Sequence, residues 1–388
     1  MLRVAAKVLA KRGGSPAACM IAALGLIAVV PAAMAQPVQG AAARPLAVHV
    51  KNHRLIDQDG ATIRLLGVDR SGTEYMCLSG GGIFDGPVDS AAIAAIKAWH
   101  ANVVRVPLNE DCWLGINLDS GNPDIGAAYR KAIADFVARL GKAGLYAILD
   151  LHWNAPGEQV ADRQQPMADL DHGPAFWASV AAAFRPNRAV IFDLYNEPYL
   201  GSWSCWRDGC MVTTSGGSWK TAGMTTLVAA VRRAGATQPI MLGGLAYASD
   251  LSRWLGFAPA DPLADAANDP VRGQPQLIAS YHTYCGPPGT STTAACRSSL
   301  PAIEGQWPAA LKVSRMVPVV TGEFGEYDCT STYVDPYMKF ADRYGISYLG
   351  WAWDTYDCGA FPALISNYRG TPTRYGAGLR DHLAALAQ

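Results

Sequence analysis

Two glutamates, Glu197 and Glu323, occupy positions from which a pair of carboxylates could carry out catalysis. Glu197 follows Asn196 at the end of Val190 to Tyr195, an apolar run rich in β-branched and aromatic residues that predicts a buried strand. Glu323 follows a second such run, Val317 to Thr321. Because side chains from parallel strands converge at their carboxyl ends in α/β proteins, we expect the two carboxylates to face each other.

A facing pair of carboxyl groups suits glycoside hydrolysis. In a retaining mechanism the two groups lie about 5 to 5.5 Å apart; one attacks the anomeric carbon and the other serves first as acid and then as base. The acid must be protonated while the nucleophile is ionised, so their surroundings must separate the two pKa values. This chemistry needs no metal or cofactor, and we expect none.

Other polar and aromatic side chains fall at the same ends of the predicted strands. They are Arg105, His152, Asn196, His282, Tyr284, Trp351 and Trp353. Each one alone has an ordinary explanation, such as a surface ion pair, a core histidine or core packing, but their common placement is hard to attribute to accident. Arg105 and Tyr284 could donate hydrogen bonds to the nucleophile and keep it charged. The histidines could orient carboxylates or sugar hydroxyls.

Eight units of strand followed by helix would position these residues. The predicted strands cover residues 63–68, 102–107, 145–151, 190–195, 239–242, 276–281, 317–321 and 346–353. Alternating units predict a parallel sheet, and eight of them favour an α/β fold closed into a (β/α)8 TIM barrel over an open doubly wound sheet. Asp59-Gly60 predicts the turn of an N-terminal β-hairpin. The irregular stretch 199–217 predicts an extended loop on the catalytic face. Helical spacing then predicts a helix over residues 219–234 and a final helix over residues 374–386.

Six short motifs follow one another at these strand ends. They read Val-Val-Arg-Val-Pro-Leu, Asp-Leu-His-Trp, Tyr-Asn-Glu-Pro, Tyr-His-Thr-Tyr, Thr-Gly-Glu-Phe-Gly and Leu-Gly-Trp-Ala-Trp. In this order they resemble glycoside hydrolase family 5, the cellulase family of the retaining clan A. Single motifs are weakly specific, whereas the ordered set is highly specific. The resemblance runs from about Arg54 to the C-terminus.

The resemblance implies a role for each site residue. Glu197 would be the general acid/base, Glu323 the nucleophile, and Asn196 the residue that holds the sugar 2-hydroxyl. The supporting residues would be Arg105, His152, His282 and Tyr284. A tryptophan of the eighth strand would stack on the sugar at the cleavage point, and both Trp351 and Trp353 lie near that position. We favour Trp353, the last aromatic residue before a polar turn.

Aromatic residues on the expected catalytic face suggest the substrate, because aromatic rings stack on sugar rings. They are Trp113, Trp153, Tyr199, Trp203, Trp206 and Tyr247. A cleft of this kind suits a β-linked glucan or mannan, and we expect an endo-β-1,4-glucanase. The alternatives are a β-mannanase or glycolipid-directed β-glycosidase of the same family, and a non-catalytic carbohydrate-binding barrel. A serine esterase is disfavoured because no G-x-S-x-G motif is present.

The charge of the chain is balanced, with 32 basic and 32 acidic residues and no basic run after the N-terminal segment. This pattern indicates neither nucleic acid nor an anionic membrane surface as a partner. We therefore expect a monomer whose partner is a β-linked oligo- or polysaccharide.

The first 35 residues have the features of a secretory signal peptide. A basic segment precedes the apolar run Met20 to Val30, and Ala33-Met34-Ala35 forms a cleavage site. The run is shorter than the ~20 residues that span a bilayer, so an uncleaved anchor is the less favoured alternative. We expect residues 1–35 to be removed and residues 36–388 to form one catalytic domain that is secreted or periplasmic.

Eight cysteines follow the predicted signal peptide, and an even count in an exported chain suggests disulfides. Eight cysteines allow 105 pairings, and the simplest proposal joins neighbours. The proposed pairs are Cys77 with Cys112, Cys205 with Cys210, Cys285 with Cys296, and Cys329 with Cys358. A zinc site is the weaker alternative, since there is no C-x2-C pair and no H-E-x-x-H motif. The first and last pairs would connect neighbouring loops of the catalytic face.

Overall fold

The computed structural model describes residues 44–265, 273–285 and 303–388. The predicted signal peptide therefore lies outside the described residues. Residues 44–388 form one compact unit, in which parallel strands close into a barrel in the order β10-β11-β12-β13-β4-β5-β6-β7. The predicted (β/α)8 fold is confirmed. No helix of the described residues combines the length and apolar character needed to cross a bilayer.

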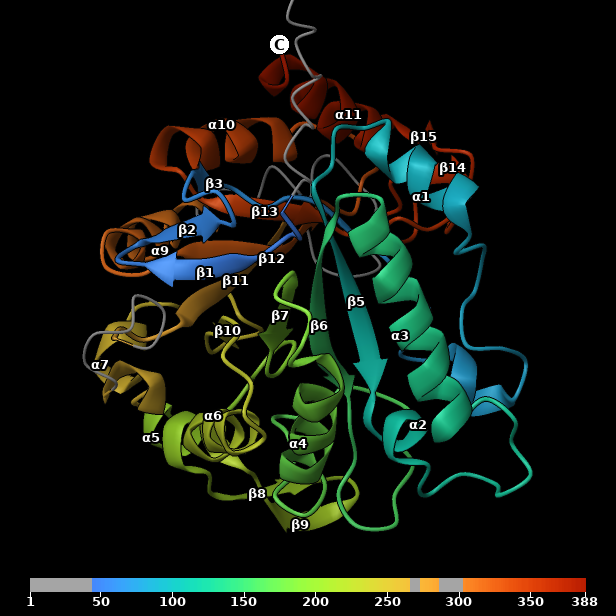
Figure 1. The fold of residues 1–388 in the computed structure, drawn as a ribbon, viewed down its shortest axis with the longest axis vertical. Coiled ribbons are helices and arrows are strands. Elements are labelled where there is room, and N and C mark those ends of the chain that lie inside the picture. Colours follow the sequence, from blue (N-terminus) through green and yellow to red (C-terminus); the bar gives the residue numbers. More distant parts are fainter. Residues whose placement is uncertain (1–43, 266–272, 286–302) are drawn as a thin grey trace, which may run out of the picture. The chain divides into compact units, whose positions relative to one another are not determined.

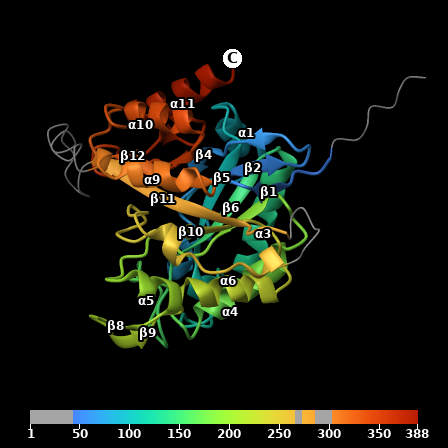
Figure 2. The same cartoon turned by 90° about the vertical axis from the view of Figure 1, so that its left-hand side faces the viewer.

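The barrel strands lie inside a ring of helices, as Figures 1 and 2 show for α3, α4 and α6. The strands are β4 (Leu66–Asp69), β5 (Val103–Asn109), β6 (Tyr146–Trp153), β7 (Val190–Asp193), β10 (Ile240–Gly243), β11 (Leu277–Cys285), β12 (Val319–Glu326) and β13 (Ser347–Gly350). The helices are α1 (Ser90–Lys97), α2 (Glu110–Leu114), α3 (Ala127–Lys142), α4 (Gly173–Phe184), α5 (Trp203–Asp208), α6 (Gly223–Arg233), α7 (Trp254–Phe257), α9 (Trp307–Ser314), α10 (Val334–Tyr344) and α11 (Arg374–Leu386), with short 3-10 turns at Met76–Ser79 and Pro262–Asp265.

Alternate residues of each strand face the barrel interior. The interior cluster near the amino ends of the strands contains Val103, Tyr146, Ile148, Ile191, Met241, Ile278, Val320 and Leu349. Their neighbours in sequence, such as Val104 and Leu149, belong to the outer core beneath the helices. Two residues farther along three of these strands stand Arg105, Asp150 and Asp193, so the same alternation turns these charged side chains inward.

A small antiparallel sheet covers the amino-terminal mouth of the barrel. It consists of β1 (Val48–Lys51), β2 (Arg54–Asp57) and β3 (Thr62–Ile63), and the turn predicted at Asp59-Gly60 joins β2 to β3. Val48, Val50 and Leu55 complete the interior cluster. The side chain of Gln276 accepts a hydrogen bond from the Val50 amide at 2.7 Å and donates one to its carbonyl at 3.0 Å, which ties the sheet to the barrel.

The segment between β7 and α6 has more regular structure than its sequence predicted. It contains α5 and a hairpin of β8 (Met211–Thr214) and β9 (Gly217–Lys220), and α6 begins only at Gly223. The expected helix from Trp219 was therefore wrong at its start. The β-branched residues of β8 pair with β9, and this pairing overrides the helical spacing that Trp219 shares with later apolar residues. A second hairpin, β14 (Ile365–Asn367) with β15 (Thr371–Pro372), precedes α11.

Three of the four proposed disulfides are present in the described residues. Cys77–Cys112 joins the loop after β4 to α2, and Cys329–Cys358 joins the loops that follow β12 and β13. Cys205–Cys210 closes α5 against the following strand. Cys285 is also disulfide-bonded, whereas its proposed partner Cys296 lies outside the described residues.

Candidate active site

A cavity of about 680 Å³ opens at the carboxyl end of the barrel strands. The predicted site residues that line it are His152, Asn196, Glu197, His282, Tyr284, Glu323 and Trp351. Arg105 lies buried beneath them and contacts Glu323 and Asn196. The structure therefore brings together almost the whole predicted set.

Glu197 and Glu323 face each other across this cavity. An oxygen of each carboxylate and a nitrogen of His282 all lie within 4.8 Å of one another. Nδ1 of His282 is 3.0 Å from Oε1 of Glu197 and 3.6 Å from Oε2 of Glu323. This separation matches the pair that forms a covalent intermediate and is too short for the pair that admits a water between the carboxyl groups.

A bulge in β12 turns Glu323 into the barrel. Val320 faces the interior, so strict alternation would send Glu323 outward with Thr321. The ladder to β11 instead pairs Tyr281 with Thr321 and then His282 with Glu323, which leaves Gly322 as the extra residue. A Cβ atom at Gly322 would lie 2.8 Å from Nε2 of His282, so a glycine is needed there.

Both oxygens of Glu323 accept strong hydrogen bonds. Nη1 of Arg105 donates to Oε1 at 2.7 Å, and the phenol of Tyr284 donates to Oε2 at 2.6 Å. These two donors, one of them charged, fix the direction of the carboxylate, as a nucleophile requires.

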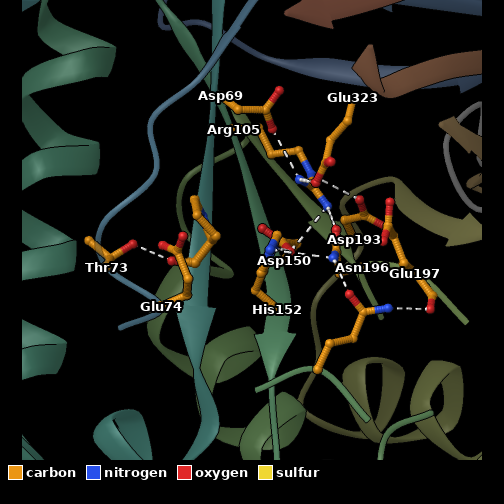
Figure 3. A network of polar contacts seen from close by, with 12 residues as sticks. Asp69, Thr73, Glu74, Arg105, Asp150, His152, Asp193, Asn196, Glu197 and Glu323 are labelled. Carbon is orange, nitrogen blue, oxygen red and sulfur yellow. Dashed lines mark hydrogen bonds and ion pairs between the residues drawn. The ribbon is translucent and has the colours of Figure 1, made fainter. Parts of the chain in front are cut away.

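Arg105 lies at the centre of a buried group of charges (Figure 3), in which the sequence reasoning missed three aspartates. Its guanidinium forms ion pairs with Asp69, Asp150 and Asp193 at 3.0, 3.1 and 3.2 Å, besides the one with Glu323. Asp150 and Asp193 each stand alone in an apolar strand sequence, Asp69 ends another apolar strand, and a carboxylate buried in this way needs a partner. That solitary charge was the available signal.

Burial favours protonation of some carboxyls in this group. It raises the pKa of Asp193 to about 7 against the attraction of Arg105, and it raises the pKa of Asp69 well above its usual range. One guanidinium cannot balance four carboxylates in a buried site, so protonation relieves the excess negative charge.

Glu197 has the environment of a general acid. Burial raises its pKa to about 7, even though His152 and Arg105 attract its charged form. Burial also lowers the pKa of the neighbouring His282 to about 4, so this imidazole is neutral near pH 7. The Gln164 side chain donates a hydrogen bond to the Glu197 carbonyl at 2.7 Å and fixes the backbone at this point.

Asn196 and His152 form the floor of the cavity. Oδ1 of Asn196 accepts from Nη2 of Arg105 at 2.9 Å, and Nδ2 lies 3.4 Å from Nε2 of His152. Nδ1 of His152 lies 2.9 Å from Oδ2 of Asp150. Burial disfavours the charged imidazole, but the charge of Asp150 and this hydrogen bond prevail and raise the pKa of His152 to about 9. His152 stacks on Trp351 with ring centres 5.3 Å apart.

The structure places Trp351, and not the favoured Trp353, in the lining of the cavity. Trp353 is 1% exposed and packs edge-on against Trp99 at 4.8 Å. Strict alternation would put residues 351 and 353 on the same face, but β13 ends at Gly350, and the turn that follows leaves Trp353 in the outer core.

The loop aromatics do not all line the cavity. Trp113, Trp203 and Trp206 are buried in the core, whereas Tyr247 is 54% exposed and lines the cavity. Tyr199 stacks on Tyr247 with ring centres 4.9 Å apart. Tyr327 and Phe361, which the sequence reasoning did not single out, line the cavity as well.

A family model for cellulase (glycosyl hydrolase family 5) matches residues 57–357. Endoglucanase MaCel5A of Microbulbifer sp. (strain ALW1) is 23% identical over 87% of this chain, and mannan endo-1,4-beta-mannosidase of Streptomyces lividans is 25% identical over 79%. The chain spans 58% and 66% of the length of these two curated relatives.

A solved structure with the same fold is the beta-glucanase SdGluc5_26A from Saccharophagus degradans in complex with cellotetraose. Its TM-score to this chain is 0.62 at 19% identity, and the match covers 89% of this chain and 95% of that one. At this identity the likeness shows a shared barrel fold.

Proposed function

Since this chain belongs to glycosyl hydrolase family 5, we propose that it is a retaining endo-β-1,4-glucanase. Glu197 is its general acid/base and Glu323 its nucleophile. The observation that carries this proposal is the short separation of the two carboxylates around His282, with donors on both oxygens of Glu323 alone.

The mechanism follows from the two environments. Oε of Glu323 attacks the anomeric carbon while protonated Glu197 gives its proton to the glycosidic oxygen, so the sugar–oxygen bond breaks and a glycosyl–Glu323 ester forms. Glu197, now ionised, takes a proton from a water, which attacks the same carbon and releases Glu323. Neutral His282 leaves the Glu197 proton in place, because a cation at 3.0 Å would favour the ionised acid.

The relatives support a β-linked glucan as the substrate. One is an endoglucanase, and the structural neighbour is a beta-glucanase bound to cellotetraose. The mannosidase relative makes mannan the second candidate. Tyr247 and Trp351 at the cavity supply rings on which either sugar could stack.

Hydrolysis of purified polysaccharides tests this function. We expect release of reducing ends from carboxymethylcellulose or mixed-linkage β-glucan, with a rapid fall in viscosity that marks internal cleavage. The first-formed product should keep the β-anomer by NMR. A mannan preference would select the second candidate, and an α-anomer product would contradict the retaining mechanism. A purified, folded protein that hydrolyses none of these polymers and no aryl β-glycoside would favour a binding protein.

The pH profile is expected to reveal the Glu197 proton. For a polysaccharide, kcat/KM should fall as the pH rises through about 7, because ionised Glu197 cannot protonate the leaving oxygen. An aryl glycoside with an acidic phenol needs no such proton, so its kcat/KM should lack this decline.

The variant Glu197→Gln is the control for this profile. The carboxyls of Glu74 and Asp193 also have a pKa raised to about 7 by burial, and their titration could produce a similar decline. We expect the decline to vanish in Glu197→Gln, measured on whatever polysaccharide activity remains. If it persists unchanged, another carboxyl is responsible.

We further propose that residues 1–35 direct export and that the remaining chain is one catalytic domain. The three disulfides of the described residues support an oxidising destination outside the cytoplasm.

A further inference from the structure

A second group of acidic side chains lies outside the catalytic pair, between α2 and the start of α4. Its central residue is Glu110, the first residue of α2, whose side chain is 0% exposed. Neither oxygen of the Glu110 carboxylate has a hydrogen-bond partner among the described residues. A buried carboxylate without a donor is costly, so Glu110 needs either a proton or a positive group beside it.

Asp169 and His172 converge on Glu110 from the connection between β6 and α4. One oxygen from each carboxylate and one imidazole nitrogen all lie within 4.8 Å of one another. Asp169 is held in place by the amide of Asn154, which donates to Oδ2 at 2.8 Å, and by the backbone NH of His172, which donates to Oδ1 at 2.7 Å. Nδ1 of His172 lies 3.8 Å from Oδ1 of Asp169. Three potential ligands therefore share one small space.

The charge around these three residues is strongly negative. Two further carboxylates, Asp111 and Asp171, act electrostatically on Glu110. They are already bonded elsewhere: Asp111 accepts from Asn117 and the Ala161 amide, and Asp171 accepts from the Gly157 amide. Among the described residues, no lysine or arginine forms an ion pair with any of the four carboxylates.

We propose that Glu110, Asp169 and His172 bind a divalent metal cation. Two carboxylates and an imidazole form a mixed oxygen and nitrogen set, which suits Mn²⁺ or Zn²⁺ better than Ca²⁺, whose ligands are oxygens. His172 is 24% exposed, so solvent can reach the site and supply the remaining ligands. The cation supplies the positive charge that Glu110 lacks. The competing explanation is a proton shared between Glu110 and Asp169.

Hydrogen bonds would connect a cation at this position to Asn196 in the candidate active site. Asn154, which holds Asp169, accepts a hydrogen bond from the phenol of Tyr195 at 2.9 Å. Tyr195 precedes Asn196 and also contacts the backbone of Gln165. The metal would thus hold in place the connection between β6 and α4, which carries Gln164. Because its ligands lie outside the cavity and do not contact the reacting atoms, we assign it a structural role.

Titration of the full-length protein with Mn²⁺ tests the proposal, after dialysis against EDTA and then against metal-free buffer. Calorimetry and the loss of the free Mn²⁺ EPR signal should give one bound equivalent in the wild type. Glu110→Gln, which keeps the size of the side chain, should weaken binding at least tenfold. Zn²⁺ should compete for the site, and Ca²⁺ should compete poorly.

Three further variants make the result decisive. Glu158→Gln, an exposed change of the same type in the same connection, should bind Mn²⁺ as the wild type does. Glu323→Gln should also keep the full equivalent, because Glu197, His282 and Glu323 form the other group with metal-ligand spacing. His172→Ala serves if Glu110→Gln fails to fold and should weaken binding likewise. No binding to the wild type, or equal binding by wild type and Glu110→Gln, would overturn the proposal and leave the shared proton.

Discussion

Replacement of Glu323 by Ala is expected to abolish hydrolysis, lowering kcat/KM on polysaccharide by about 10⁵-fold or more, the scale of loss when an enzyme loses its covalent nucleophile. The physical reason is that hydrogen bonds from Arg105 and Tyr284 orient the Glu323 carboxylate, and no other carboxylate of the described residues that line the cavity is held in this way. Reducing-sugar release beside the wild type measures the loss. Glu158→Gln is the matched control and should leave activity unchanged.

Rescue of Glu323→Ala by a small anion tests whether Glu323 acts as the nucleophile or is needed only for the structure of the site. Azide added to Glu323→Ala should occupy the space of the missing carboxylate and attack an activated aryl β-glycoside from the side on which Glu323 lies. The product should be a glycosyl azide whose anomeric configuration is inverted relative to the substrate. Substrate affinity should change far less than turnover. Full activity in Glu323→Ala would contradict the assignment of Glu323 as the nucleophile. A glycosyl azide with retained configuration would show that the space left by Glu323 lies on the side of the leaving group, which also contradicts it.

Glu197→Gln is expected to separate substrates by their leaving groups. For polysaccharides, whose departing alcohol needs a proton, kcat/KM should fall by about 10²- to 10⁴-fold, the usual contribution of a general acid. For an aryl β-cellobioside with an acidic phenol, the fall in kcat/KM should be much smaller. The two losses are measured side by side on one preparation. An equal loss on both substrates would contradict the role of Glu197 as acid.

The strands and the positions of Glu197 and Glu323 could be predicted because both depend on local pattern. Apolar runs such as Val190 to Tyr195 end in polar residues, and the carboxyl ends of parallel strands share one face of a barrel. Helix α11 was predicted with its observed bounds, Arg374–Leu386, because no strand pairing competes there with the helical spacing of the apolar residues.

The rest depends on register and on contacts between distant residues, which a single sequence does not encode locally. The bulge at Gly322 decides which way Glu323 points, and it is defined only by the pairing of β12 with its neighbours β11 and β13. The preference for Trp353 failed for a similar reason, since the turn after β13 could not be placed to the residue. Asp150 and Asp193 were visible as lone charges in apolar runs, but the partner that they share with Asp69 appears only when four strands close together.

The small sheet at the amino-terminal end of the barrel determines how far the chain can be truncated at its N-terminus. The segment that matches the family begins at residue 57, which is the last residue of β2. A recombinant chain that started there would lose β1 and nearly all of β2, and water would reach the apolar side chains that Val48, Val50 and Leu55 now cover. The boundary of the family match is therefore not the boundary of the folding unit, and an expression clone should begin at or before Leu46, which packs against the same cluster.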